Sequence, residues 1–302
     1  MSENKPNPSH AAKPGANSGQ TGLTPREVAA KHRQSELRRE RSRRAVIGGA
    51  IIAVVAAIVI IAALLFKKNN EDSQADVQSK GPAPAYGNQY GGVVLGKGGK
   101  LQKAGGFQVD PGTVGPPAKE ASSKAPSGSA PTKKGGPGQI IVYVDMLCPH
   151  CGEFEKMFGD YLAGLADKGT ATVEYRVISI LDQSVNQNYS TRAGGAMMSV
   201  ADKFPDKFVP AMRAMFEQQP NESAGAGNDK IKEILKGAGV PGEIEKMVDN
   251  GDFRYYTTFA NKLAAHEGVS GTPSIYVEGS KWDPQADSDF QKFVEERLAA
   301  RK

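Results

Sequence analysis

The segment from Ile140 to Cys151 reads IIVYVDMLCPHC, and it decides the fold of this chain. Its first five residues form a short apolar run of β-forming side chains, which predicts a buried strand. A helix is predicted to follow, because apolar side chains then recur at helical spacing: Phe154, Met157, Phe158, Tyr161, Leu162 and Leu165. A pair of cysteines two residues apart therefore stands at the junction of a strand with a helix.

The rest of the C-terminal half continues this alternation. The predicted elements are a strand over 173–177, a helical stretch over 190–267, a strand over 274–277 and a helix over 287–300. Breaks in the helical stretch are expected at Pro205, around 220–228 and at Pro241. This order predicts an α/β domain over 139–302 with an inserted helical subdomain at about 182–267.

The residues before this domain have the composition of a linker. Residues 67–138 contain 15 Gly and 8 Pro, a density typical of disordered and linker segments rather than of a core. A short hairpin is the one local structure expected there, with Val93–Leu95 and Phe107–Val109 pairing around Gly98 and Gly99. The lysine-containing stretch over 119–138 is predicted to be a flexible spacer.

A single transmembrane helix is predicted over 45–66. These 22 residues carry no charge, and as a helix they would cover roughly 33 Å, enough to cross a bilayer core. Five arginines precede the run: Arg38, Arg39, Arg41, Arg43 and Arg44. The excess of positive charge on that side predicts a cytoplasmic, mostly disordered tail over 1–44 and an extracytoplasmic domain. A cleaved signal peptide is the alternative reading of the same run.

The net charge of +5 does not indicate a nucleic-acid-binding protein. Residues 1–44 carry +6 and the linker +5, whereas the predicted domain carries −6. The basic charge thus lies outside the part of the chain that could shape a binding site, and no nucleic acid is expected as a partner.

The spacing of the two cysteines favours redox chemistry. Cys148 precedes the first turn of the predicted helix, where unpaired N–H groups and the helix dipole stabilise a thiolate. We therefore expect Cys148 to be the exposed nucleophile and Cys151, one turn deeper, to resolve a mixed disulfide. Pro149 suits the first helical turn, which needs no N–H, and His150 would add a donor beside the same sulfur.

Other uses of a CxxC pair fit less well. A zinc site would need more ligands than the two thiolates, and the domain has only His150 and His266 to add, so no metal is expected. Attachment of haem requires a histidine directly after the second cysteine, where this chain has Gly152. A purely structural disulfide stays open as an alternative for an exported chain, although so short a loop would constrain the unfolded chain little.

Residues 139–302 resemble the thioredoxin-fold thiol–disulfide oxidoreductases of the DsbA type. The resemblance is carried by the strand, the CPHC motif, the helical insertion and the Gly271-Thr272-Pro273-Ser274 sequence before a strand. It implies that Thr272 and Pro273 form a loop with a cis peptide bond that receives the substrate backbone. Some relatives have a buried acid six residues before the nucleophile; Val142 stands there, which leaves Asp145 as the candidate proton-transfer acid. The anchor and linker resemble membrane-tethered members from actinobacteria.

These observations predict an enzyme that donates disulfides to exported proteins through the Cys148–Cys151 pair. A stabilised Cys148 thiolate favours the reduced pair and so makes its disulfide a strong oxidant. No cofactor is expected beyond this pair, so a quinone-linked membrane protein of the DsbB or VKOR type would have to reoxidise it. The expected partners are unfolded or reduced exported proteins, together with membrane lipid around the anchor. A reductase or isomerase, and a non-redox chaperone or binding module on the same fold, are the alternatives.

Overall fold

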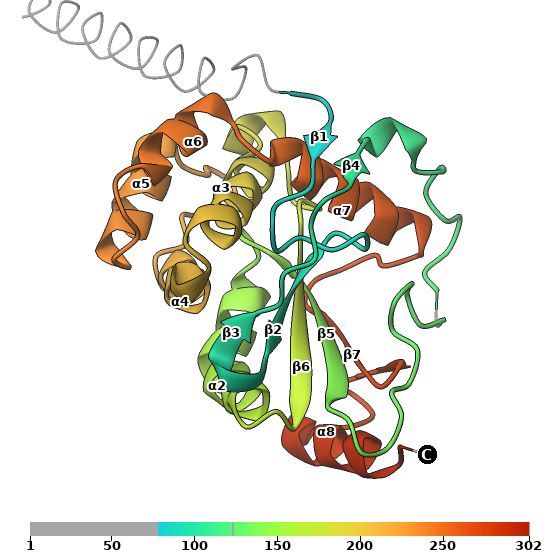
Figure 1. Ribbon diagram of the computed structural model, residues 1–302. Helices are drawn as coiled ribbons and strands as arrows, with labels where there is room; N and C mark the ends of the chain where they lie inside the picture. The colour runs from blue at the N-terminus through green and yellow to red at the C-terminus, as the bar shows by residue number, and fades with distance from the viewer. Residues whose placement is uncertain (1–77, 123, 302) are drawn as a thin grey trace, which may run out of the picture. The chain divides into compact units, whose positions relative to one another are not determined.

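The computed structural model describes residues 78–122 and 124–301 (Figure 1). The predicted cytoplasmic tail, the predicted transmembrane helix and the first residues of the predicted linker lie outside these ranges. Among the helices of the described ranges, none is both long and apolar enough to cross a bilayer.

A mixed six-stranded sheet forms the centre of the domain, in the order β3-β2-β6-β5-β7-β8. The bounds of its strands are β2 Gly92–Gly96, β3 Lys100–Leu101, β5 Gly138–Asp145, β6 Ala171–Ile178, β7 Ser274–Val277 and β8 Ser280–Lys281. Strands β5 and β6 are parallel, whereas β7 runs antiparallel to β5. Strand β5 is buried nearly throughout and reads as an almost continuous apolar run. Strand β6 is equally buried, but its apolar residues alternate with Thr172, Glu174 and Arg176.

Helices cover both faces of this sheet. Helix α2 (Pro149–Asp167) and helix α8 (Phe290–Ala299) pack on the face that carries Ile140 and Val142. Helix α7 (Arg254–His266) places Ala260 and Ala264 against Ile141 and Tyr143 on the opposite face. The alternation of side chains along β5 thus serves two separate cores.

The predicted helical insertion is confirmed. Between β6 and β7 the chain forms α3 (Tyr189–Lys203), α4 (Phe208–Glu217), α5 (Asn228–Gly237), α6 (Ile244–Asn250) and α7. In Figure 1, α3 to α6 gather in one group while α8 lies at the other end of the sheet. The expected breaks occur, and a further one separates α6 from α7, where Gly251 and Phe253 both have positive φ.

The prediction of a linker over 67–138 is wrong for the part of it that the structure describes. Strand β2 pairs antiparallel with β6, with Gly92 opposite Arg176 and Leu95 opposite Val173. Val93 and Leu95 are buried in the core. Glycine at position 92 reflects close packing, since a Cβ there would lie 2.5 Å from the Glu174 carboxylate. Gly92 therefore reflects close packing within a strand and not disorder.

The predicted hairpin forms around the expected glycines but with a different second strand. Strand β2 pairs with β3, with Leu95 opposite Leu101, and Gly98 and Gly99 between them both have positive φ. The turn over residues 97–99 is so short that β3 pairs with β2 directly after the chain reverses. Strand β4 (Gln108–Val109) instead pairs with β1 (Gly81–Pro82) in a separate two-stranded sheet.

The predicted spacer before β5 is fastened to the domain by polar contacts. The Glu278 carboxylate accepts hydrogen bonds from the backbone N–H groups of Thr132 and Gln139, both at 2.6 Å. The carbonyl oxygen of Ser127 accepts one from the Arg176 guanidinium at 2.8 Å. These contacts could not be predicted from composition, because their donors and acceptors lie far apart in the sequence.

Arg176 is the centre of a buried polar network on the face beneath α7. Its side chain is fully buried and donates to the Glu174 carboxylate and to the Tyr143 hydroxyl, both at 2.7 Å. Together with Ser127, these partners satisfy the guanidinium where water is excluded. The network joins two strands to the segment that precedes β5.

Candidate active site

Cys148 lies at the N-terminus of helix α2, in the position from which the helix begins. Strand β5 ends at Asp145, two residues form a turn, and the helix starts with Pro149 in its first turn. The backbone N–H of Cys148 donates to the carbonyl oxygen of Asp145 at 3.0 Å, which closes the turn. The first turn of α2 thus presents its N–H groups toward Cys148, as predicted.

Both cysteines are free thiols and both are buried, which the sequence predicts for Cys151 but not for Cys148. Cys148 is 6% exposed and Cys151 0%. Cys148 was expected at the exposed end of the motif, but the loop before β7 lies against it. The sulfur of Cys148 donates to the carbonyl oxygen of Thr272 at 3.4 Å.

The loop that contacts Cys148 has the backbone conformation that the resemblance implies. The peptide bond between Thr272 and Pro273 is cis. Strand β7 begins at the next residue, and Ser274 pairs with Tyr143 near the end of β5. This antiparallel pairing is what brings Thr272 and Pro273 beside the cysteine motif.

The pKa values of the two thiols are shifted in opposite directions. The hydrogen bond from Cys151, helped by the Thr272 side chain and by the backbone N–H groups of Cys151 and His150, lowers the pKa of Cys148 to about 6 against the effect of burial. Burial, followed by the hydrogen bond to Cys148, raises the pKa of Cys151 far above its ordinary value. At neutral pH the pair therefore holds a thiolate on Cys148 and a proton on Cys151.

The sequence matches a known family over more than half of its length. Residues 133–296, which are 164 of the 302, match the family model described as Thioredoxin. The chain belongs to this thioredoxin family. A second family model, described as Carboxypeptidase Rv3627c-like, N-terminal domain, matches residues 36–94.

Solved structures and a curated protein from Mycobacterium tuberculosis are similar to this family member. The reduced DsbA of M. tuberculosis is 28% identical to this chain with a TM-score of 0.45, and the match covers 59% of this chain and 97% of DsbA. The reduced DsbG of M. tuberculosis is 26% identical with a TM-score of 0.46, and the match covers 63% of this chain and 94% of DsbG. The serine/threonine-protein kinase PknE is 28% identical over 151 residues, 46% of this chain but only 26% of the kinase.

The architecture of this thioredoxin-family domain is DsbA-like. A helical region is inserted between β6 and β7, and the Cys148–Cys151 pair lies beside a cis proline. The family match, the helical insertion and the Cys148–Cys151 pair are those of a DsbA-like thiol–disulfide oxidoreductase. Within the described ranges, no group of three or more histidine, cysteine or acidic side chains is arranged to hold a metal ion.

His150 interacts with its own helix more than with the sulfur. Its Nδ1 lies 3.1 Å from the Glu153 carboxylate, and the side chain is exposed. The pKa of His150 is raised mainly by this hydrogen bond and by the charge of Glu153, and less by the charge of Cys148. The predicted role of His150 as a donor to Cys148 is thus supplied instead by its backbone N–H.

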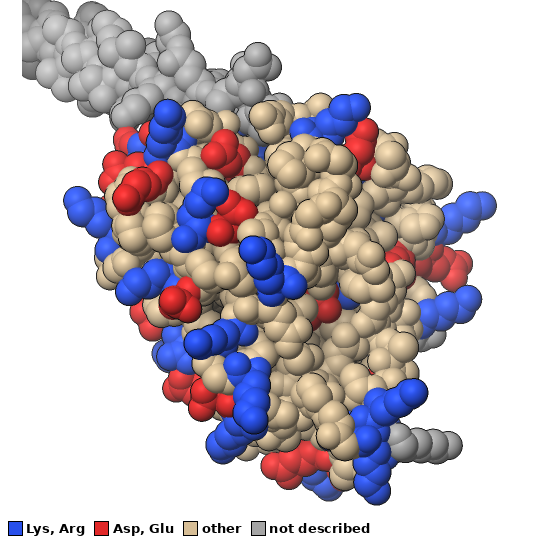
Figure 2. Space-filling model, in the orientation of Figure 1, with Lys and Arg blue, Asp and Glu red and all other residues tan. Residues whose placement is uncertain are grey.

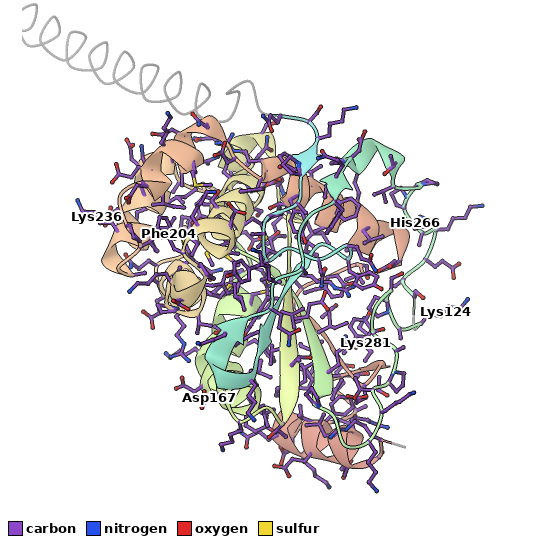
Figure 3. All side chains as sticks on the ribbon, viewed as in Figure 1. Lys124, Asp167, Phe204, Lys236, His266 and Lys281 are labelled. Atoms are coloured by element: carbon purple, nitrogen blue, oxygen red, sulfur yellow. The ribbon has the colours of Figure 1, made fainter. Side chains whose placement is uncertain are left out.

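The domain's other histidine joins the end of α7 to the segment that contains Pro116. His266, labelled in Figure 3, ends that helix, and its Nδ1 donates to the carbonyl oxygen of Pro116 at 2.8 Å.

The basic and acidic side chains of the face drawn in Figure 2 are interspersed and do not form one continuous patch.

Asp145, the candidate proton-transfer acid, is fully buried at the end of β5. One carboxylate oxygen accepts from the backbone N–H of Leu147 at 2.8 Å and the other from that of Leu181 at 3.0 Å. Burial raises the pKa of Asp145 to about 6. Its observed contacts hold the turn before Cys148, and proton transfer to Cys151 stays a prediction.

Two residues near the motif were missed by the sequence analysis. Glu155 is buried one turn beyond Cys151, where the hydroxyl of Tyr175 donates to it at 3.4 Å and burial raises its pKa to about 6. Gln219, from the segment after α4, donates to the backbone of the cysteine turn. The i+4 spacing from Cys151 could have indicated Glu155, whereas no local signal indicates Gln219.

Proposed function

We propose that this protein is a disulfide-donating thiol–disulfide oxidoreductase that acts on exported proteins. The observation that supports this direction is the unequal acidity of the pair, with the pKa of Cys148 lowered to about 6 and Cys151 kept protonated by burial. A stable thiolate lowers the free energy of the reduced pair. The disulfide is then the less stable form and passes readily to a substrate dithiol.

The proposed reaction moves two electrons and one proton from the substrate to the protein, because Cys151 ends as a thiol and Cys148 as a thiolate. A substrate thiolate attacks the sulfur of Cys148, the Cys148–Cys151 bond breaks, and Cys151 leaves and takes up a proton. A second substrate thiol, losing its proton, attacks the substrate sulfur of the mixed disulfide. The substrate disulfide forms and Cys148 leaves as a thiolate, which its acidity makes a good leaving group.

The Thr272–Pro273 loop is the proposed place for the substrate backbone. The Thr272 carbonyl oxygen already lies 3.4 Å from the Cys148 sulfur. An extended peptide that paired with this loop would therefore place its own cysteine next to the reacting atom.

The proposed location is the outer side of a membrane, with the chain anchored through residues 45–66. The uncharged run and the five arginines before it support this proposal. A quinone-linked membrane protein of the DsbB or VKOR type is the proposed reoxidant. Protease added to cells without their wall should release a fragment containing the folded domain, and protection of that domain would reverse the orientation.

The direct test of function uses the oxidised protein and a reduced peptide that contains two cysteines. We expect the wild type to convert one equivalent of peptide to its disulfide while its own pair is reduced, and Cys148→Ser to convert none. Failure of the wild type to oxidise the peptide, with rapid reduction of a disulfide-containing protein, would favour a reductase. Prevention of client aggregation that survives Cys148→Ala/Cys151→Ala, with no thiol transfer by the wild type, would favour a chaperone.

A further inference from the structure

Gln219 connects the helical insertion to the turn that carries Cys148. It lies two residues beyond the end of α4, and its side-chain nitrogen is 3.0 Å from the carbonyl oxygen of Met146 and 3.1 Å from that of Cys148. Only the donor end of an amide can serve two carbonyl oxygens, so these contacts also fix which way the amide points. One side chain thus holds both ends of the turn.

The other end of the same amide explains a glycine beside the motif. A Cβ at Gly152 would lie 2.6 Å from the oxygen of Gln219. Any other residue at position 152 would therefore displace the amide from its place between the insertion and α2. The glycine at position 152 thus leaves room for the Gln219 side chain, which lies 67 residues later in the sequence.

The turn is held from two sides by two different segments. On one side Asp145 accepts from the N–H groups of Leu147 and Leu181, and thereby ties the turn to the segment after β6. On the other side Gln219 donates to Met146 and Cys148. Met146 is fully buried, so its carbonyl oxygen has no ready replacement for the donor that Gln219 supplies.

We propose that Gln219 is a positioning residue for the Cys148 thiol, holding the turn before α2 in place from the helical insertion, with Gly152 leaving room for its amide. The Cys148 thiolate is stabilised by hydrogen bonds from the Cys151 thiol, from the Thr272 side chain and from backbone N–H groups. Because these contacts require one position of the Cys148 backbone, loosening the turn weakens them and makes the thiol less acidic. The inference rests on the proposed thiol–disulfide chemistry of Cys148.

The test measures the acidity of Cys148 in variants of the reduced protein. Gln219→Ala removes the amide, Gln219→Met keeps much of the side-chain length without a donor or a charge, and Gly152→Ala displaces the amide while keeping it in the chain. Gln218→Ala is the matched control, since the Gln218 side chain is exposed and accepts a hydrogen bond from Lys230 rather than from the cysteine turn. Thiolate absorbance against pH gives the pKa of Cys148, and the rate of alkylation by iodoacetamide gives its reactivity.

We expect the three test variants to titrate at higher pH than the wild type and the control. A rise of about one pKa unit corresponds to about tenfold slower alkylation at a pH below both values. At a pH well above both values the rates should converge. A purely structural role would change the free energy of unfolding but not the titration of the folded protein.

The double variant decides whether Gly152 and Gln219 act through one contact. Without the amide, an alanine at position 152 has nothing to displace, so Gly152→Ala should have no further effect in the Gln219→Ala background. Additive shifts, or titrations of all variants that coincide with the wild type, would overturn the inference. These results do not depend on the direction of disulfide transfer: a low reduction potential of the wild type would refute the proposed function and leave this inference intact.

Discussion

The sulfur of Cys148 lies 3.4 Å from the carbonyl oxygen of Thr272, although 124 residues separate them along the chain. The contact follows from the antiparallel pairing of β5 with β7, which sets the end of one strand beside the start of the other. It places the nucleophile next to a backbone group that an extended substrate can reach. The proposed transfer of disulfides to a substrate depends on this arrangement.

The two cysteines should differ in their ability to trap a client. In Cys151→Ala, Cys148 can attack a client disulfide but nothing within the protein resolves the product, so mixed disulfides should accumulate. In Cys148→Ala the remaining thiol is fully buried and protonated at neutral pH, and should trap little. Non-reducing gels of both variants with the same client measure this, and equal trapping would mean that the nucleophile is assigned wrongly.

The stability of the reduced protein relative to the oxidised one should depend on pH. The pKa of Cys148 falls from its ordinary 9.0 to about 6 in the folded state. A lowered pKa of this kind contributes stability that is complete above the unfolded value and is lost as pH falls through the folded value. The contribution should be roughly 1.4 kcal/mol at pH 7 and roughly 2.7 kcal/mol at pH 8, at about 1.4 kcal/mol per pH unit.

Urea unfolding of both redox forms between pH 5.5 and 8.5 measures this dependence. Trp282, the only tryptophan of the chain, packs on Phe290 and Phe158 and can report unfolding by its fluorescence. Asp145 and Glu155 are present in both forms, so the difference between the forms isolates the thiols. A difference that stays constant with pH would show that Cys148 is an ordinary thiol.

Strand β2 should be as important for stability as the central strands β5 and β6. Leu95 is 2% exposed and belongs to the main core, so Leu95→Ala should lower the free energy of unfolding by about 2–5 kcal/mol. The control is Lys97→Ala, an exposed position two residues away, which should change it by less than about 0.5 kcal/mol. Equal, small effects of the two substitutions would show that residues 92–101 behave as a linker and do not belong to the core.

Breaking the buried network should be costly, unlike breaking an exposed ion pair. Arg176→Met leaves the Glu174 carboxylate, 3% exposed, without its charged partner, and should cost about 3–5 kcal/mol in the free energy of unfolding. Lys292→Met removes an exposed pair with Glu296 and should cost less than about 1 kcal/mol. Urea titrations of the two variants beside the wild type compare these losses directly.

The parts of the fold that sequence patterns predict are those decided by local chemistry. The apolar run of β5, the helix after Cys148 and the strand after Pro273 each have a periodicity or a breaker within a few residues, and the structure confirms all three. Met157 is an exception, since it fits the apolar spacing of α2 but is 64% exposed. Periodicity therefore identifies an element more reliably than it identifies each buried residue.

The parts that were missed depend on contacts between distant segments. Strand β2 is short and flanked by glycines, and only its pairing with β6 shows that Gly92 makes room for Glu174. The buried position of Cys148 depends on Thr272, and the hold on its turn depends on Gln219. Local spacing identified the chemistry of the site, but not the residues that set its geometry.

The reduction potential of the Cys148–Cys151 pair, measured by equilibration with glutathione, tests the proposed direction most directly. A thiolate stabilised by a pKa near 6 predicts an oxidising pair, with a potential above about −180 mV, nearer to oxidases than to reductases. A potential of about −270 mV, that of a reducing thioredoxin, would contradict the proposal that this protein donates disulfides.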